Sequence, residues 1–136
     1  MASLVLANTR IFMLEDNAQN ASVQQTILEL AGAKVGFERW GTNSIPAIEA
    51  FLPINIILLD LHFPKITGYE ILREVRANQN LSKIPVVAVS ASDASVEMSK
   101  ARRAGFNGYL SKPIDLGRFT SQVKEIINGN VIWYAR

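Results

Sequence analysis

A continuous apolar run that ends in a carboxylate constrains the fold of this chain more than any other feature. The run covers residues 54–60, with the sequence INIILLD, and it lies between Pro53 and Pro64. A strand that is covered on both faces has such an unbroken run, whereas a strand with one wet face alternates. The segment therefore predicts an interior strand of a parallel sheet. Asp60 at its end is either a turn residue or a functional carboxylate.

Strand-like and helix-like segments alternate along the whole chain. Strands are expected at 9–16, 33–39, 54–60, 83–90 and 107–111. Apolar residues at helical spacing predict five helices between and after them, and these residues are Val23, Ile27, Leu30 and Ala31; Ile45, Ile48 and Leu52; Gly68, Leu72 and Val75; Met98, Ala101 and Ala104; and Leu116, Phe119, Val123, Ile126 and Ile127, the last helix with Asp115 as its cap. This alternation predicts an α/β fold with a parallel sheet covered on both faces. The flavodoxin-like, doubly wound (βα)5 arrangement with strand order 2-1-3-4-5 is the expected topology.

The composition favours one soluble domain and argues against several classes of function. The chain has 136 residues, and 49% of them are hydrophobic, which is enough for one core. Fourteen Lys and Arg stand against twelve Asp and Glu without a run of like charge, so nucleic-acid binding is not expected. The absence of cysteine excludes disulfides and thiolate metal sites. No segment has the pattern of a signal peptide or a membrane span, which predicts a cytoplasmic protein.

Polar residues stand at the ends of four of the predicted strands. They are Glu15 and Asp16, Asp60, Ser90 and Lys112. The carboxyl ends of parallel strands meet at one edge of a sheet, and open α/β folds bind their ligands there. Independent turn residues would not be expected to place three acids beside one lysine. We therefore expect these side chains to form one functional crevice.

The composition of this crevice suits phosphoryl chemistry. Three adjacent carboxylates repel one another and raise one another's pKa unless a cation lies among them. Mg²⁺ prefers oxygen ligands, and one Mg²⁺ together with Lys112 would neutralise the three carboxylates. Asp60 is then the candidate nucleophile of an aspartyl-phosphate reaction. The metal and Lys112 would neutralise the charge of the transferred group.

Four stretches of the sequence resemble the response-regulator receiver domains of two-component signalling. They are FMLEDN, IILLDLHFPKITGYEIL, IPVVAVSAS and AGFNGYLSKP, and the resemblance extends over about residues 11–127. It implies that Asp60 is the phosphoacceptor. It implies that Asp16 holds Mg²⁺ directly, that Glu15 holds it directly or through water, and that the backbone carbonyl of His62 completes the protein ligands.

The same resemblance assigns roles to residues around the phosphoacceptor. Ser90 and Lys112 would each bind a phosphoryl oxygen, and Ser90 and Tyr109 would form the conformational switch. The side chains of residues 62 and 92 would tune how fast the phosphoryl group is lost. The peptide bond between residues 112 and 113 is a candidate for the cis form.

The implied function is a signalling switch rather than an enzyme. A sensor histidine kinase or a histidine phosphotransfer protein would phosphorylate the domain, which would then dock an unknown downstream protein on the face of its fourth helix, fifth strand and fifth helix. Residues 1–8 would be an N-terminal extension, 9–128 the receiver domain and 129–136 a C-terminal tail. Such a receiver without an output domain is expected to be a monomer or a weak dimer.

Two other functions are alternatives to a signalling switch. An aspartyl-phosphate phosphatase of the haloacid-dehalogenase type needs a second acid two residues after its nucleophile, where this chain has His62. A flavin-binding electron carrier needs Ser, Thr and Gly in the loop after its first strand, to donate hydrogen bonds to phosphate. Here that loop begins with Glu15 and Asp16, which would repel a phosphate.

Overall fold

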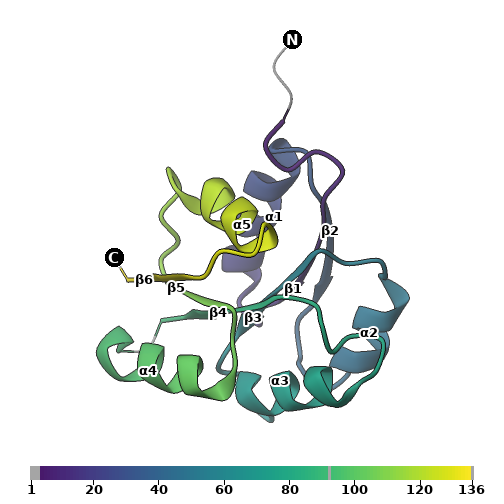
Figure 1. The fold of residues 1–136 in the computed structure, drawn as a ribbon, viewed down its shortest axis with the longest axis vertical. Helices are drawn as coiled ribbons and strands as arrows, with labels where there is room; N and C mark the ends of the chain where they lie inside the picture. Colours follow the sequence, from purple (N-terminus) through teal and green to yellow (C-terminus); the bar gives the residue numbers. More distant parts are fainter. Residues whose placement is uncertain (1–3, 92, 136) are drawn as a thin grey trace.

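The fold is a six-stranded parallel sheet between two layers of helices (Figure 1). The computed structural model describes residues 4–91 and 93–135. The strands are β1 (Arg10–Leu14), β2 (Lys34–Glu38), β3 (Ile56–Asp60), β4 (Val86–Ser90), β5 (Gly108–Ser111) and β6 (Ile132–Tyr134). The helices are α1 (Ala18–Leu30), α2 (Ser44–Ala50), α3 (Gly68–Ala77), α4 (Ala94–Ala104) and α5 (Phe119–Ile127). The strand order is β2-β1-β3-β4-β5-β6, which confirms the predicted 2-1-3-4-5 arrangement and adds a sixth strand.

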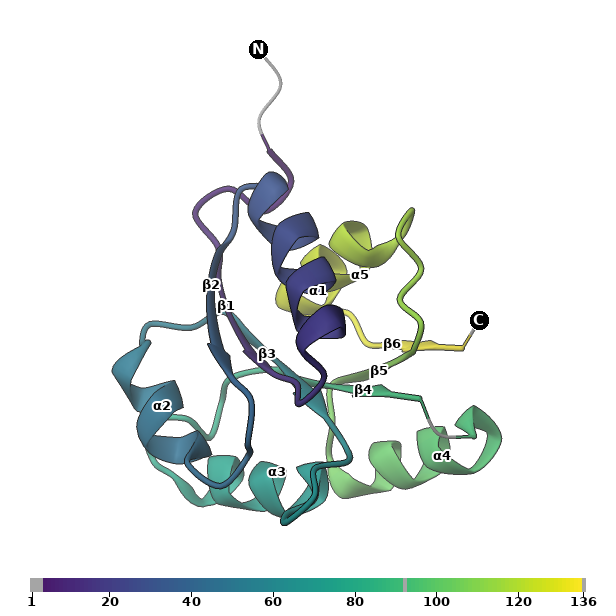
Figure 2. The same ribbon diagram turned by 180° about the vertical axis from the view of Figure 1, so that it is seen from behind.

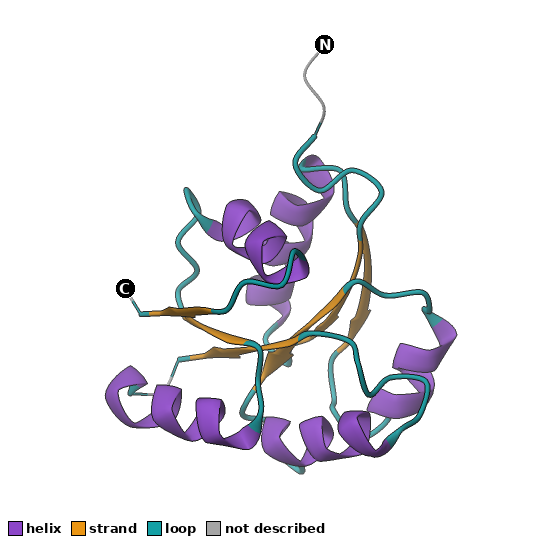
Figure 3. Ribbon diagram, in the orientation of Figure 1, coloured by secondary structure: helices purple, strands orange, loops and turns teal. Residues whose placement is uncertain are grey.

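The sheet is buried on both faces, as the unbroken apolar runs predict. Helices α1 and α5 cover one face, and α2, α3 and α4 cover the other (Figures 1 and 3). Every residue of β3 and β4 is buried. Successive residues of β3 alternate between the two cores, with Ile57 and Leu59 on the side of α2, α3 and α4, and Ile56 and Leu58 on the side of α1 and α5. Each such side chain contributes about 1.5–3 kcal/mol by leaving water.

Side-chain caps fix three helices directly after the strand ends. The Asn17 side chain accepts a hydrogen bond from the backbone N–H of Asn20 (2.9 Å), and Thr67 accepts one from Glu70 (3.2 Å). Asp93 likewise accepts one from the backbone N–H of Ser95. Because such a cap satisfies an N–H that the helix leaves unpaired, it determines where the helix begins. Three of the helices that follow strands at the carboxyl edge of the sheet therefore have capped starts.

The buried face of α1 differs from the prediction. Val23 and Leu30 are 48% and 74% exposed, and the helix instead buries Ala21, Gln24 and Leu28. Apolar residues occur on more than one side of this helix, so their spacing alone does not identify the face toward the sheet. Ile27 and Ala31, which were predicted on the same face, do pack against the core.

Helix α5 begins later than predicted. Leu116 lies in the turn before the helix and is 64% exposed, and the helix starts at Phe119. The side chain of Asp115 accepts hydrogen bonds from the backbone N–H of Gly117 (3.2 Å) and the hydroxyl of Tyr134 (2.8 Å), so it does not act as the expected cap. Phe119, Val123 and Ile126 are buried, as predicted.

Strand β6 lies in the segment that the sequence predicts to be a tail. It pairs in parallel with β5, with Tyr109 opposite Trp133 (Figure 2). Trp133 packs against the core beneath α4, and Ile132 and Tyr134 pack against the core beneath α5, which is the alternation of a strand. Three residues are too few for a recognisable pattern in the sequence. As a consequence β5 is an interior strand.

The start of α3 packs tightly against the end of β3, so Gly68 is expected to be required for stability. A Cβ atom at residue 68 would lie 2.5 Å from the backbone oxygen of Asp60 and 2.8 Å from the Cα of Leu61. Gly68→Ala should lower the free energy of unfolding by about 1–3 kcal/mol, because backbone atoms have to shift. Urea denaturation measures this. Gly117→Ala is the control, since its Cβ would have no heavy atom closer than 3.7 Å; equal losses in both variants would contradict the packing argument.

Candidate functional site

Three carboxylates meet at the carboxyl edge of the sheet. Glu15 and Asp16 directly follow β1, Asp60 ends the neighbouring strand β3, and one carboxylate oxygen from each lies within 4.8 Å of the other two. Glu15 and Asp60 are buried, and Asp16 is half-buried. The parallel register of β1 and β3 ends both strands at the same level, and this brings the acids together as the sequence predicts.

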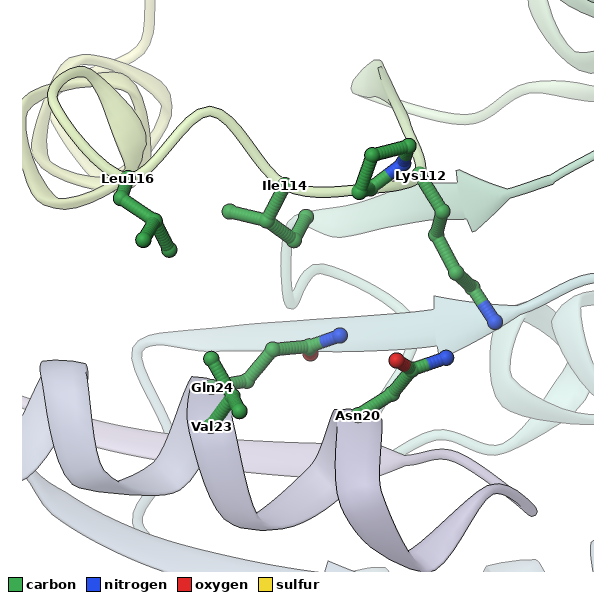
Figure 4. A pocket seen from close by; sticks show the side chains of 7 residues that line it. Asn20, Val23, Gln24, Lys112, Ile114 and Leu116 are labelled. Carbon is green, nitrogen blue, oxygen red and sulfur yellow. The ribbon is translucent and has the colours of Figure 1, made fainter.

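Lys112 crosses from β5 to these acids. Its Nζ atom lies 2.9 Å from Oε1 of Glu15 and 3.2 Å from Oδ2 of Asp60. Its backbone N–H donates to the carbonyl of Ser90 (2.8 Å), which ties the end of β5 to the end of β4. The peptide bond from Lys112 to Pro113 is cis, as predicted. Figure 4 shows the lysine side chain extending from the β5–α5 connection toward Asn20 on α1.

Burial controls the protonation of this cluster. It raises the pKa of Asp60 to about 7; the charge of Lys112 opposes the rise, and the Glu15 carboxylate adds to it. For Lys112, burial acts to lower the pKa, but the hydrogen bond to Glu15 and the charge of Asp60 outweigh it and raise the pKa. The lysine is therefore charged. Its single positive charge does not offset the effect of burial on the Asp60 carboxylate, whose pKa stays raised.

Backbone N–H groups position the carboxylates of Glu15 and Asp60. The backbone N–H of His62 donates to Oδ1 of Asp60 (3.2 Å), and that of Asn17 donates to Oε2 of Glu15 (3.2 Å). The His62 side chain lies with α4, where its Nε2 is 3.1 Å from Oε1 of Glu97. His62 therefore contacts the phosphoacceptor strand through its backbone and α4 through its ring. Ser92, the other residue predicted to tune phosphoryl loss, lies outside the described residues.

The two predicted switch residues are fully buried. Ser90 ends β4, one position beyond Val89, the partner of Asp60 in the neighbouring strand. Tyr109 lies on β5, and burial raises the pKa of its hydroxyl while a hydrogen bond with Ser90 acts to lower it. Because β6 pairs with β5, Tyr109 does not lie on the edge strand of the sheet.

Glu97 of α4 is a site residue that sequence reasoning missed. It is buried, next to His62, and it also raises the pKa of the Tyr69 hydroxyl, whose burial is the larger cause. A glutamate in a polar helix is expected to be exposed to solvent, so the sequence does not predict that Glu97 is buried. The carboxylate joins α4 to the loop after Asp60.

The donor set suits a hard divalent cation. Carboxylate oxygens of Glu15, Asp16 and Asp60 converge, and two of these acids are buried. Burial raises the pKa of Asp60, and the Glu15 carboxylate adds to the rise. Mg²⁺ takes one or two protein carboxylates together with water and phosphate oxygens. The His62 ring, which contacts Glu97, is not among the converging groups. The residues present therefore fit Mg²⁺.

Comparison with known proteins decides the family. The family model described as "Response regulator receiver domain" matches residues 11–124. The chain belongs to the response regulator receiver family. This family consists of two-component signalling modules rather than true enzymes, so the phosphatase alternative no longer applies. Membership implies a histidine kinase partner.

Individual receivers agree with this assignment. The polar-differentiation response regulator DivK of Brucella ovis is 27% identical over 117 residues, which cover 86% of this chain and 94% of DivK. The receiver domain of the sensor histidine kinase PA1611 from Pseudomonas aeruginosa PAO1 is 28% identical with a TM-score of 0.80, covering 90% of this chain and 100% of that one. Its crystal structure has a magnesium ion coordinated in the active site cleft. The bacteriophytochrome response regulator RtBRR is 27% identical with a TM-score of 0.73, covering 94% and 81%.

Asp60 is expected to destabilise the fold when it is ionised. The folded-state pKa of Asp60 is about 7, above the ordinary value of 3.8. The contribution of neutral Asp60 to the free energy of unfolding is therefore fully present below pH 3.8. It is lost as the pH rises through about 7. Without metal, Asp60→Asn should raise the free energy of unfolding at pH 8 by about 1–3 kcal/mol, and this gain should shrink toward pH 4.

Urea denaturation across this pH range, with and without Mg²⁺, measures the effect. Mg²⁺ should reduce the gain, because the cation stabilises the ionised carboxylate that the variant lacks. Asp115→Asn is the control, since Asp115 lies away from the cluster near Tyr134. A gain that is independent of pH would contradict the assignment of this effect to Asp60 ionisation.

Proposed function

We propose that this receiver is a phosphorylation-dependent switch in which Asp60 accepts a phosphoryl group from a histidine kinase or a histidine phosphotransfer protein. The observation that supports it best is the position of the Asp60 carboxylate, which lies among Glu15 and Asp16 and 3.2 Å from the Nζ of Lys112. A buried carboxylate beside a lysine and two further acids is arranged to hold a dianionic group only together with a divalent cation.

The transfer would use the residues in the following way. An oxygen of ionised Asp60 forms a bond to phosphorus while the bond from phosphorus to the donor imidazole nitrogen breaks, and the imidazole keeps the electron pair. Lys112 pairs with one phosphoryl oxygen, and the hydroxyl of Ser90 bonds another. When bound, Mg²⁺ would supply charge neutralisation, held by the carboxylates of Asp16, Glu15 and Asp60 and the backbone carbonyl of His62.

Asp16 is the stronger metal candidate of the two acids after β1. Glu15 is buried and already contacts Lys112 at 2.9 Å and the backbone N–H of Asn17 at 3.2 Å. Asp16 is half-buried, and its carboxylate converges with the others from the open side. Its shorter side chain also loses less rotamer freedom when it coordinates an ion. Glu15 then serves mainly to hold Lys112 in place.

Small acyl phosphates should phosphorylate Asp60 only when Mg²⁺ is present, because the carboxylate cluster repels the anion without it. Intact-mass spectrometry after acetyl phosphate treatment should show one phosphoryl adduct. Asp60→Asn should show none, and Asp115→Asn, a substitution of the same kind away from the cluster, should label like the unchanged protein. An adduct that forms equally well in EDTA, or that persists in Asp60→Asn, would falsify the assignment.

Phosphorylation would reach α4 by two routes. One is the contact of His62 with Glu97, which joins the loop after Asp60 to the helix. The other would run through Ser90 and Tyr109, which are both buried and lie on the adjacent strands β4 and β5. Helix α4 buries few of its residues, so it is the element that shifts at least cost. A partner would read the change on the surface of α4, β5 and α5, to which β6 now belongs.

Beryllofluoride with Mg²⁺, a mimic of the phosphoryl group, should change hydrogen exchange mainly in residues 90–118. Glu97→Gln should increase exchange in α4 before the mimic is added and should diminish the change that it causes, because the contact of residue 97 with His62 is weakened. Glu74→Gln on α3 is the matched control, since Glu74 is exposed. Changes confined to α1 and α2, or an undiminished response in Glu97→Gln, would contradict this route.

The proposed setting is the cytoplasm, because the kinase obtains its phosphoryl group from ATP. In the described ranges no helix has the length and apolar character needed to cross a membrane. The domain is expected to work as a monomer or a weak dimer without contacting nucleic acid. The flavin alternative is disfavoured because Glu15 and Asp16 occupy the loop in which a flavin phosphate would bind.

A further inference from the structure

Helices α3 and α4 are neighbours on one face of the sheet, and a groove lies between them (Figures 1 and 2). The groove has a volume of about 520 Å³ and is open to solvent. The side chains that give it its character are Tyr69, Glu70 and Arg73 on α3 and Lys100, Arg103 and Ala104 on α4. None of the three acids of the candidate site lines it, so the groove is separate from that site.

Tyr69 connects the two walls of the groove. The Nζ atom of Lys100 lies 4.5 Å from the centre of the Tyr69 ring, and this ring packs edge-on against Phe106, with 5.8 Å between the ring centres. Burial raises the pKa of the Tyr69 hydroxyl, the charge of Glu97 adds to the rise, and the charge of Arg103 acts to lower it. Two cations of α4 therefore lie near one tyrosine of α3, whose ring gives the groove an apolar surface.

The positive charge of the groove is not balanced by ion pairs in the part of the chain that the structure describes. Arg73, Lys100 and Arg103 are exposed, and none of them forms a salt bridge with a described residue. Glu70 is the one acid among the lining residues, and Glu74, which follows Arg73, does not line the groove. Three positive charges and one negative charge leave a net charge of +2, as large as that of the whole chain. The groove therefore attracts anionic groups.

The dipoles of the two helices explain only part of this arrangement. Cations are favourable in the last turn of a helix, and Arg103 lies in the last turn of α4. Arg73 and Lys100 lie outside the last turns of their helices, where Arg76 and Arg102 are found instead. The dipoles therefore do not account for the convergence of cations from both helices on one groove.

The spacing of the cations suits a helical ligand. Lys100 and Arg103 are three residues apart on α4, so they lie about one turn apart on the same side of the helix. A partner helix that lies along α4 can present acidic side chains at the same interval. Arg73 lines the groove from α3, and Tyr69 and Ala104 add less polar surface. An amphipathic helix that binds in a groove is a common mode of peptide recognition.

We propose that the groove between α3 and α4 is a docking site for an acidic amphipathic helix of a partner protein. Acidic side chains of that helix pair with Arg73, Lys100 and Arg103, and apolar side chains between them contact Tyr69. Charge complementarity selects this occupant, since the cations of the groove have no acidic partner among the described residues. An anionic membrane is the poorer occupant, because a flat lipid surface does not reach into a groove between two helices.

This docking site goes beyond the proposed function, because it uses the α3 side of α4 and can be measured without a phosphoryl group. The probe is a synthetic peptide of Ala, Leu and Glu, with Glu residues three and four positions apart beside a stripe of Leu. The controls are a peptide of the same composition in shuffled order and a peptide with Lys in place of Glu. Fluorescence anisotropy of the labelled peptides, at an ionic strength of about 0.15 M, gives their affinity for the whole chain.

Variants that remove single charges locate the binding. Arg73→Gln and Arg103→Gln should each weaken the helical peptide about threefold, and the double variant about tenfold, because single exposed ion pairs contribute little. Arg102→Gln is the matched control, since Arg102 is next to Arg103 but stacks on Trp133 and does not line the groove. All three arginines are exposed, so these substitutions should preserve the fold and the acetyl phosphate labelling of Asp60.

Binding of the helical peptide that is weakened in Arg73→Gln and Arg103→Gln, but not in Arg102→Gln, would support the docking site. Absence of binding, equal binding of either control peptide, or equal weakening in Arg102→Gln would overturn it. Flotation with phosphatidylserine vesicles tests the membrane alternative. Vesicle binding that depends on Arg73 and Arg103, without peptide binding, would identify a lipid surface as the occupant instead. Labelling of Asp60 tests the proposed function independently, so the two failures can be distinguished.

Discussion

The structure depends on how two buried carboxylates are kept at one edge of a parallel sheet. Glu15 and Asp60 lie on adjacent strands, where their charges repel and burial deprives them of water. Lys112 relieves this by contacting both, at 2.9 Å and 3.2 Å. The lysine comes from β5, so the acids and their cation are brought together only when the parallel core of β1, β3, β4 and β5 has formed. Because burial disfavours the ionised carboxylates, a divalent cation that neutralises them would stabilise the site.

The parallel topology explains why the site was predictable from the sequence. The apolar runs identify interior strands, and parallel strands end at a common edge, so Asp60 and Lys112 had to meet once the strand order was known. Glu97 and β6 were not predictable in this way. A glutamate becomes buried through the packing of neighbouring elements, and a strand of three residues is too short for a periodic pattern. On α1, Ile27 and Ala31 pack against the core as predicted, whereas Val23 and Leu30 do not, because apolar spacing does not reveal which side a helix presents to the sheet. The start of α5 was also predicted wrongly.

Strand β6 changes the surface from which a receiver of this shape can be read. With β6 in place, Tyr109 is fully buried and has Trp133 opposite it in the next strand. A movement of Tyr109 would therefore reach β6 as well as α4, with which Tyr109 shares a core. Arg102 links the same strand to α4, which also contacts the loop after Asp60 through Glu97. The outer strand thus lies at the junction of both routes from the site.

The close contact of Gly68 with the end of β3 makes the surroundings of Asp60 mechanically asymmetric. On the α3 side, backbone lies against backbone, and not even a methyl group fits between them. On the α4 side, the contacts are made by the side chains of His62 and Glu97, which can rotate. The structure around Asp60 is therefore more easily displaced on the α4 side than on the α3 side.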